Sequence, residues 1–306
     1  MTKPPFYNQV TVIGMGLVGS SLMRVMAEKK LANRIVGCDN DAKTLVRAKT
    51  LALAHQLESD VAVACNNADL VVLATPVGAM AEVVATIAPA LKKNAVITDT
   101  GSTKTSVIAS VAPLIPGHAI FIPSHPIAGT EFSGPDAGFA TLFKGRYWII
   151  TPIGEGKNDG GGGGDASLQH ATDHLADFLA ATGALVARMD ADYHDKVLAI
   201  TSHLPHLIAY TIVGTAFDFG KDLERDIIRF AASGFRDFTR IAASDPIMWR
   251  DVFINNADAV LAILDRFNGD LAKLATAIRQ QKADALQDHF TRTRDIRRRI
   301  KDIGQL

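Results

Sequence analysis

Short apolar runs alternate with amphipathic stretches over roughly the first 190 residues of the 306-residue chain. The runs typical of strands are Val10–Ile13, Arg34–Cys38, Leu70–Ala74, Ala95–Asp99, Ala119–Pro123 and Tyr147–Thr151. Helical periodicity is found between them, at Ser20–Lys29, Asp41–Ala48, Met80–Ala88 and Lys104–Val111. Buried strands that alternate with helices indicate a parallel sheet covered on both faces. We therefore predict an α/β domain of the doubly wound, Rossmann type.

The pattern changes after a glycine-rich segment at residues 157–167, whose composition is typical of a flexible surface loop. One more helix is predicted at Leu168–Thr182 and one more strand at Ala184–Met189. Beyond them the chain is almost entirely helical. We predict a domain boundary near residue 189, with the α/β domain at residues 1–189 and an all-helical domain at residues 190–306.

Composition excludes several classes of protein. The chain is 48% hydrophobic and 21% charged, which allows a substantial core and argues against wholesale disorder. Lysine plus arginine equals aspartate plus glutamate at 32 each, so no overall charge attracts nucleic acid or a membrane surface. The basic C-terminal stretch is read as a solvated helix face. The two cysteines, Cys38 and Cys65, form no spaced cluster, which fits a reducing cytoplasm.

The stretch Val197–Phe217 is apolar enough to suggest a membrane span. It contains His203, Pro205 and His206, which are costly inside a bilayer. A buried helix of a soluble protein is therefore the better interpretation. The N-terminus also lacks the apolar core of a signal peptide.

A dinucleotide motif follows the first strand. The sequence GMGLVG places Gly14, Gly16 and Gly19 at the start of a helix, and Asp39 ends the second strand twenty residues beyond Gly19. The first glycine permits the tight turn, the second lets the backbone approach a pyrophosphate, and the third lets helix and strand pack closely. The first helical turn, with Leu17 and Val18, offers free N–H groups to the phosphates.

The acidic residue favours NAD over NADP. Asp39 can accept hydrogen bonds from the adenosine ribose hydroxyls, and its charge repels a 2′-phosphate. No arginine follows it directly. A further strand ends in ATPV, so Thr75 and Pro76 are candidates to line the cofactor or simply to end the strand in a turn. The motif alone does not say which substrate is oxidised.

Two segments that carry candidate catalytic groups end at the same edge of the predicted sheet. DTGSTK places Ser102 near a helix N-cap, and IPSHPIAGTE places His125 in a turn that looks like neither a helix face nor a strand. Pro126 pushes His125 toward an extended conformation and so fixes the direction of its ring. A histidine has a suitable pKa to take the proton of an alcohol as hydride leaves.

At this point the sequence resembles the prephenate/arogenate (cyclohexadienyl) dehydrogenases of tyrosine biosynthesis. The segments that carry the resemblance are GMGLVG, DTGSTK, SHPIAGTEFSG, SHLPH and GFRDFTRIAASDPIMW, in this order and over nearly the whole chain. The resemblance implies NAD-dependent oxidative decarboxylation of prephenate to 4-hydroxyphenylpyruvate, of arogenate to tyrosine, or of both. It also implies a small-molecule substrate and a homodimer, with the helical domain serving in substrate binding and dimerisation.

The resemblance also implies roles for individual residues. His125 matches the histidine that assists deprotonation of the ring hydroxyl, and Ser102 matches the serine that orients it. Arg240 matches the arginine that binds the substrate carboxylate. The remaining positions that match the substrate pocket or the subunit contact are Thr130, Glu131, His194, Ser202, His206 and Trp249.

The residue pattern of the second half is consistent with a site. Ser202 and His206 are four apart and share a helical face, whereas His203 points about 100° away and is read as a core residue. Pro205 predicts a kink or break between them. H-x-x-H can also suggest a metal, but no third ligand is evident, so no metal is expected. Asp245 and Pro246 predict the start of a further helix.

Two other interpretations stay open. A β-hydroxyacid dehydrogenase or imine-type reductase also joins a dinucleotide domain to a helical one, and it would use a lysine on the first long helix of the second domain. Lys196 is the candidate, but SHLPH and DFTR are then unexplained. A non-catalytic NAD-binding protein would bind the cofactor without turning over prephenate or arogenate.

Overall fold

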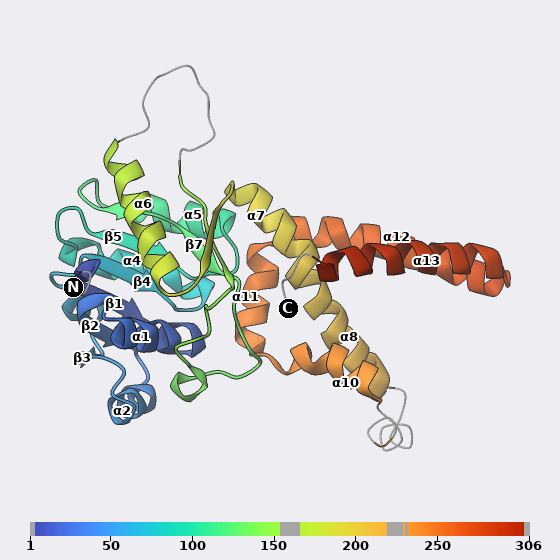
Figure 1. Cartoon of the computed structure of the whole chain (residues 1–306), viewed down its shortest axis with the longest axis horizontal. Helices are drawn as coiled ribbons and strands as arrows, with labels where there is room; N and C mark the ends of the chain where they lie inside the picture. Colours follow the sequence, from blue (N-terminus) through green and yellow to red (C-terminus); the bar gives the residue numbers. More distant parts are fainter. Residues whose placement is uncertain (1–3, 154–165, 219–228, 230–231, 303–306) are drawn as a thin grey trace. The chain divides into compact units, whose positions relative to one another are not determined.

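The structure is a computed structural model that describes residues 4–153, 166–218, 229 and 232–302 (Figure 1). By its internal contacts the chain forms two compact units, Met1–Asn256 and Ala257–Leu306. The first holds the sheets and the helices around them, and the second is helical. The boundary predicted near residue 189 stays a prediction. Most of the glycine-rich segment lies outside the described residues.

A six-stranded parallel sheet forms the centre of the first unit, with strand order β3-β2-β1-β4-β5-β6. Its strands are β1 (Tyr7–Ile13), β2 (Ala32–Cys38), β3 (Gln56–Glu58), β4 (Leu70–Leu73), β5 (Val96–Asp99) and β6 (Ile120–Phe121). This order is the one of doubly wound dinucleotide-binding folds, so the predicted fold class is confirmed. The three-residue β3 was not predicted, because so short a run leaves no apolar pattern.

Helices cover both faces of this sheet. The helices are α1 (Leu17–Lys29), α2 (Ala42–Thr50), α3 (Val61–Cys65), α4 (Met80–Ile87), α5 (Thr105–Val111) and α6 (Ala166–Ala181). One buried core contains side chains of α1 and α6, and the other contains side chains of α3, α4 and α5. Strand β1 contributes Val10 and Val12 to the first core and Ile13 to the second, as expected for a strand buried on both faces.

A second, three-stranded sheet differs from the prediction in two ways: it is separate from the parallel sheet, and it contains His125. Tyr147–Ile150 (β8) and Leu185–Arg188 (β9) are strands as predicted, but they form a separate sheet with Ser124–Pro126 (β7). Strand β7 pairs antiparallel with β8, placing His125 opposite Ile149. The segment around His125 is therefore a strand, contrary to the prediction. Three residues interrupted by proline carry too little alternation to reveal it.

The helical part of the first unit begins with a long helix that is locally irregular. It runs through α7 (Ala191–Leu198), a π-helical segment η5 (Ala199–His203) and α8 (Leu204–Asp218). The helix does not break at Pro205 as the sequence allowed; its irregularity is the π-helical segment that ends two residues before the proline. Residues 191–218 are long and apolar enough to cross a membrane, and 28% of their most apolar window is buried in the single chain.

In the described residues that follow, 232–256, the elements are α10 (Ser233–Thr239), η6 (Arg240–Ala243) and α11 (Pro246–Asn255). The helix start predicted at Asp245 and Pro246 is confirmed. The Asp245 carboxylate accepts hydrogen bonds from the backbone N–H groups of Ile247 and Met248, both at 2.9 Å.

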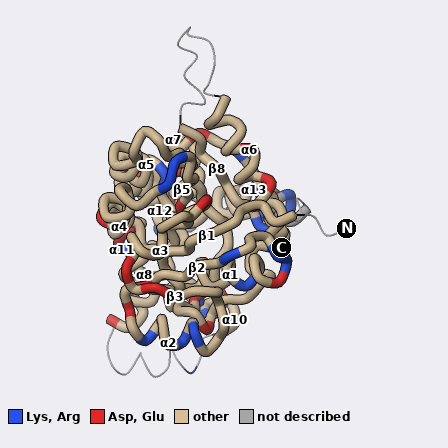
Figure 2. Tube along the Cα trace, turned by 90° about the vertical axis from the view of Figure 1, so that its left-hand side faces the viewer, with Lys and Arg blue, Asp and Glu red and all other residues tan. Residues whose placement is uncertain are grey.

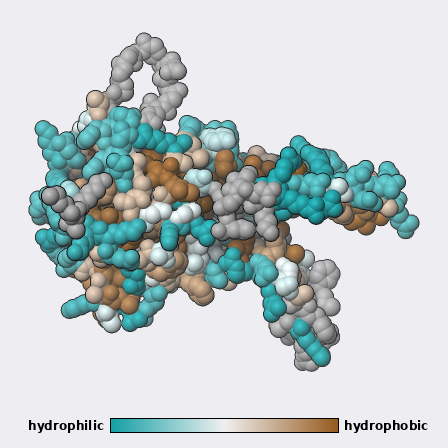
Figure 3. Space-filling model, in the orientation of Figure 1, coloured by the Kyte–Doolittle hydropathy of each residue, from teal (hydrophilic) through white to brown (hydrophobic). Residues whose placement is uncertain are grey.

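The second unit contains two helices in contact, α12 (Ala257–Arg279) and α13 (Ala283–Asp302). Their exposed large apolar side chains are Leu261, Leu271, Ile278, Phe290 and Ile296. Figure 3 shows hydrophobic patches among hydrophilic residues on this unit. In Figure 2 lysine and arginine (blue) and aspartate and glutamate (red) are scattered among the other described residues.

Candidate active site

The turn between β1 and α1 carries the three glycines of the dinucleotide motif. Gly14 has a φ of +93°, and a Cβ there would lie 2.5 Å from the carbonyl oxygen of Ala74. A Cβ on Gly19 would lie 2.0 Å from the carbonyl oxygen of Gly14, so α1 packs on the turn only because no side chain intervenes. A Cβ on Gly16 would meet nothing within 4 Å. The turn thus leaves open space where the motif places a pyrophosphate.

Asp39, which follows β2, is held against the same turn. Its carboxylate accepts hydrogen bonds from the backbone N–H of Met15 at 2.9 Å and of Asp41 at 3.0 Å. Carboxylate oxygens have two lone pairs each, so further acceptor positions remain for ribose hydroxyls. Leu17 and Val18 begin α1 and are half-buried.

Thr75 and Pro76 follow β4 beside the glycine turn. The backbone nitrogen of Thr75 would lie 3.0 Å from a Cβ at Gly14. The Thr75 hydroxyl is buried and has no hydrogen-bond partner among the described residues, whereas Pro76 is exposed. A buried polar atom without a partner is costly unless a ligand or water completes its bonding. This hydroxyl, the Asp39 carboxylate and the space at Gly16 together fit a dinucleotide.

His125 lies in the middle of β7, with its side chain only 8% exposed. Its Nδ1 is 2.9 Å from Nε2 of His194. Its Nε2 makes no hydrogen bond with the described residues. Burial is the main cause that lowers the pKa of His125 well below its usual 6.5, and the nearby Lys104 ammonium lowers it further. A neutral imidazole with one nitrogen held and the other free is suited to general base catalysis.

Ser102 is half-buried in the segment between β5 and α5, and its hydroxyl makes no hydrogen bond with the described residues. Its predicted place near the helix N-cap needs correction, because α5 begins at Thr105 and the N-cap residue is Lys104. The N–H groups of Lys104 and Thr105 bind instead to the side chain of Asp195, 2.7 and 2.8 Å away. Because the residue that caps α5 comes from another helix, the sequence around residue 104 does not show where α5 begins.

Arg240 and Glu131 are brought together across 109 positions of sequence. The guanidinium Nη1 of Arg240 is 2.8 Å from Oε2 of Glu131, in the loop that follows His125. Thr130 is exposed beside Glu131, and its hydroxyl accepts a hydrogen bond from the N–H of Phe132 at 3.3 Å.

Ser202, His206 and Trp249 form a second cluster. The Nδ1 of His206 is 2.8 Å from the carbonyl oxygen of Ser202, and the rings of His206 and Trp249 are stacked with centroids 3.6 Å apart. The buried indole Nε1 of Trp249 has no hydrogen-bond partner among the described residues. Burial lowers the pKa of His206, and the positive charge of Arg240 lowers it further. Helix α8, which carries His206, also packs against η6, which begins with Arg240, so the cluster lies near that arginine.

His194 and His203 are both fully buried. The Nδ1 of His203 is 3.1 Å from Nδ2 of Asn256, and burial lowers the pKa of His203 to about 4. Its assignment as a core residue is confirmed. His194 uses both ring nitrogens inside the chain, with Nδ1 at 2.8 Å from Oδ1 of Asp195 and Nε2 facing His125. A direct contact between His194 and a substrate stays a prediction.

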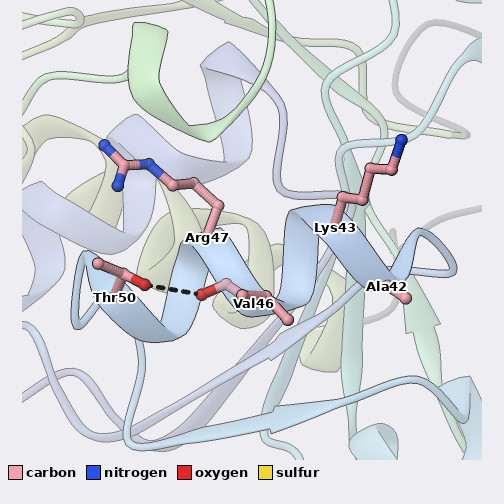
Figure 4. Close-up of a pocket in the computed structure, with 5 residues that line it drawn as sticks. All are labelled: Ala42, Lys43, Val46, Arg47 and Thr50. Atoms are coloured by element: carbon pink, nitrogen blue, oxygen red, sulfur yellow. Dashed lines mark hydrogen bonds between the residues drawn. The ribbon is translucent and has the colours of Figure 1, made fainter.

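Lys196, the candidate of the alternative interpretation, does not point into this site. Its side chain is 64% exposed and pairs with Asp192 at 2.6 Å on the surface of α7. A hollow of about 520 Å³ on the outer face of α2 also lies apart from the chemistry (Figure 4). It is lined by five residues of that one helix, Ala42, Lys43, Val46, Arg47 and Thr50.

Three charged residues beside His125 were missed by sequence reasoning. Lys104 and Asp99 form an ion pair with both side chains fully buried, and Lys104 Nζ also donates to the carbonyl oxygen of Ser124 at 2.7 Å. Asp195 lies between α5 and His194. Lysine and aspartate are normally exposed, so only the tertiary structure reveals that these are not. Among the described residues, no group of three side chains could hold a metal ion.

Two protein-family profiles match the chain. The profile described as "Prephenate dehydrogenase, nucleotide-binding domain" matches residues 22–160. The profile described as "Prephenate dehydrogenase, dimerization domain" matches residues 190–292.

Individual proteins match over nearly the whole chain. The cyclohexadienyl dehydrogenase of Zymomonas mobilis subsp. mobilis is 42% identical over 298 residues, covering 96% of this chain and 97% of that protein. The prephenate dehydrogenase of Bacillus subtilis is 30% identical over 94% of this chain and 75% of its own length. The crystal structure of prephenate dehydrogenase from A. aeolicus, in complex with hydroxyphenyl propionate and NAD+, has a TM-score of 0.84. Its sequence is 27% identical, and the match covers 96% of this chain and 98% of that one.

Proposed function

Because the chain belongs to the prephenate dehydrogenase family, we propose that it catalyses the NAD-dependent oxidative decarboxylation of prephenate, of arogenate, or of both. The products are 4-hydroxyphenylpyruvate and tyrosine respectively, which places the reaction in tyrosine biosynthesis. One observation carries the catalytic assignment: a buried His125 has a free Nε2, and the loop that follows it reaches Arg240 through Glu131.

NAD, when bound, supplies the hydride acceptor. The residues that would hold it are Gly14, Gly16 and Gly19 of the turn, the first turn of α1 and, on either side, Asp39 and Thr75. The Asp39 carboxylate, fixed by two backbone N–H groups, offers its remaining lone pairs to ribose hydroxyls and repels a 2′-phosphate. This supports NAD rather than NADP. Leu17, Val18 and Pro76 would line the cofactor.

His125 handles the proton. Its Nε2 accepts the proton of the substrate's ring hydroxyl as the ring carbon is oxidised. The ring carboxylate then leaves as CO2, and its bonding electrons restore aromaticity. The proton returns from Nε2 to the phenolate oxygen, so the histidine ends the cycle neutral. Aromatisation provides the driving force, and the chain mainly has to position the reactants.

The other predicted residues would hold the substrate. Arg240 contacts Glu131 through Nη1, so its other guanidinium N–H groups can bind a substrate carboxylate. The orphaned indole Nε1 of Trp249, stacked on His206, offers another donor in the same region. We assign Thr130, Ser202 and His206 to the walls of the substrate pocket, Glu131 to the orientation of Arg240, and Ser102 to the orientation of His125.

We also propose a homodimer, a boundary near residue 189 between the nucleotide-binding and dimerisation domains, and a cytoplasmic location. The dimer is supported by the apolar side chains that the single chain leaves exposed on α12 and α13. The boundary is supported by the two family profiles, which end at residue 160 and begin at residue 190. The location is supported by the two cysteines, both free and buried.

The catalytic assignment is tested with His125→Asn. We expect kcat to fall by about 10²–10⁴-fold, which is the usual contribution of acid–base assistance. A matched control is His118→Asn, because His118 is exposed and its Nε2 contacts the carbonyl oxygen of Leu91 at 2.9 Å, apart from β7. The control should keep the wild-type kcat. A His125→Asn enzyme with near-normal turnover of both substrates would rule out the proposed role.

A further inference from the structure

A continuous chain of hydrogen bonds runs from the start of α5 to His125. The Asp195 carboxylate accepts from the backbone N–H of Lys104 at 2.7 Å and from that of Thr105 at 2.8 Å. Its Oδ1 also lies 2.8 Å from Nδ1 of His194, and Nε2 of His194 lies 2.9 Å from Nδ1 of His125. These three side chains are 4%, 0% and 8% exposed, so water does not compete for the bonds.

The Asp195 carboxylate determines which atom is the donor in each hydrogen bond of this series. Burial raises the pKa of Asp195, but hydrogen bonds to the carboxylate outweigh it and lower this pKa overall. Two of these bonds come from backbone N–H groups, which can only donate. The carboxylate is therefore ionised and can only accept, so Nδ1 of His194 must carry a hydrogen. Burial lowers the pKa of His194, which keeps that ring neutral and its Nε2 an acceptor. His125 must then donate through Nδ1, which leaves the lone pair of a neutral His125 on Nε2.

We infer that Asp195 is a positioning residue: acting through His194, it selects the tautomer of His125 in which Nε2 can accept a proton. The inference rests on the reaction proposed above and adds to it a residue that does not touch the substrate. The reversed tautomer would place a hydrogen on Nε2 of His125, where it could not act as a base. The same carboxylate also caps α5. It therefore links the start of that helix to the ring of His125 through His194.

These three side chains, Asp195, His194 and His125, form a relay that also stabilises the positive charge that His125 gains during turnover. When Nε2 of His125 takes the hydroxyl proton, the O–H bond breaks, an N–H bond forms and the ring becomes an imidazolium. Its Nδ1–H stays bonded to His194, whose own Nδ1–H stays bonded to the Asp195 carboxylate. The other charged or titratable groups near the two rings are Lys104, Asp99 and His203. Lys104 is already paired with Asp99, so Asp195 is the negative charge that faces the relay.

The tautomers can be read directly from the nitrogen chemical shifts of a protein labelled with 15N-histidine, in a two-bond 1H–15N correlation spectrum. The signals are assigned with His125→Asn and His194→Gln. In the wild type, both His125 and His194 should carry hydrogen on Nδ1 and a free lone pair on Nε2. A His125 with hydrogen on Nε2 would overturn the inference without any variant of Asp195.

Asp195→Asn tests the cause. The N–H of Lys104 and Nδ1 of His194 share Oδ1 of Asp195, whereas the N–H of Thr105 bonds to Oδ2, so an amide must give up one of the backbone bonds. With its NH2 group at the position of Oδ1, the amide donates to Nδ1 of His194, which the carboxylate never does. We expect the Nε2–H tautomer of both histidines, absent from the wild type, to become populated, and kcat to fall in proportion to the molecules that hold it, up to the loss of about 10⁴-fold for general bases held in the wrong tautomer. The Kd for NAD should stay within about twofold of the wild type. Unchanged tautomers in this variant would contradict the inference.

Asn256→Ala is the matched structural control, since Asn256 Nδ2 donates to the backbone carbonyl oxygen of Asp195 at 2.9 Å and leaves its carboxylate alone. It should lower the free energy of unfolding while retaining the wild-type tautomers and losing far less kcat than Asp195→Asn. If Asp195→Asn and Asn256→Ala lost the same amount of kcat, Asp195 would have only a structural role and the inference would be wrong. A wild type with the inferred tautomers that oxidises neither prephenate nor arogenate would instead refute the proposed function.

Discussion

The three glycines of the nucleotide turn are predicted to fail in different ways when replaced by alanine. At Gly19, the new Cβ would lie 2.0 Å from the carbonyl oxygen of Gly14, whereas real Cβ contacts do not fall below 3.0 Å. Helix α1 or the turn must then move by about 1 Å, and forced overpacking of this kind costs about 1–3 kcal/mol. Gly19→Ala should therefore lower the free energy of unfolding by that amount even without NAD.

Gly16→Ala should do the opposite. Its Cβ would meet nothing within 4 Å and its φ of −67° suits alanine, so the free energy of unfolding should change by less than about 1 kcal/mol. The methyl group would occupy the space that the pyrophosphate needs. We expect the Kd for NAD to rise by about tenfold or more, equivalent to about 1.4 kcal/mol of binding free energy.

Urea denaturation of the unliganded proteins measures the first quantity, and titration calorimetry with NAD measures the second. The predicted result is a stable Gly16→Ala protein that binds NAD poorly and a destabilised Gly19→Ala protein. If Gly16→Ala bound NAD as tightly as the wild type, the turn would not hold the pyrophosphate. If the two variants lost the same stability, the packing argument would be wrong.

Four further predictions follow from the site. Arg240→Ala should lower kcat/KM for the substrate by about 10- to 100-fold, because a charge-assisted hydrogen bond contributes about 1.5–3 kcal/mol; an effect confined to the Kd for NAD would contradict it. Asp39→Ser should narrow the preference for NAD over NADP in kcat/KM, and an unchanged ratio would count against a ribose contact. Lys104→Met leaves the Asp99 carboxylate buried without its cation, so urea denaturation should show a loss of about 3–5 kcal/mol that the added Asp99→Asn partly restores. A pKa of His125 lowered by burial keeps the base neutral in mild acid, so the acid limb of kcat/KM should lie below pH 6.5, and a limb above that value would contradict the assignment.

The α/β part of the fold could be predicted because its strands are buried on both faces. Runs such as Leu70–Leu73 are continuously apolar, and the stretches between them have helical periodicity. The second sheet could not be predicted in the same way. Its strand β7 has three residues, and the pairing of His125 with Ile149 depends on contacts that no local pattern records.

The cofactor turn and the reactive histidine were recognisable because their motifs constrain neighbouring residues. Their supporting charges were not. Asp195 lies 90 positions from the N–H of Thr105 that it accepts, and Lys104 is fully buried although lysine is usually exposed. The role of Arg240 followed from the family resemblance, whereas its pairing with Glu131 emerged only from the structure.

The central claim is that this chain oxidises a cyclohexadienol with NAD. Initial rates of NADH formation, measured in parallel with prephenate and with arogenate and repeated with NADP, test it most directly. We predict turnover of at least one of the two substrates, with a higher kcat/KM for NAD than for NADP. No reduction of either cofactor by either substrate, in a folded protein that binds NAD, would contradict the claim.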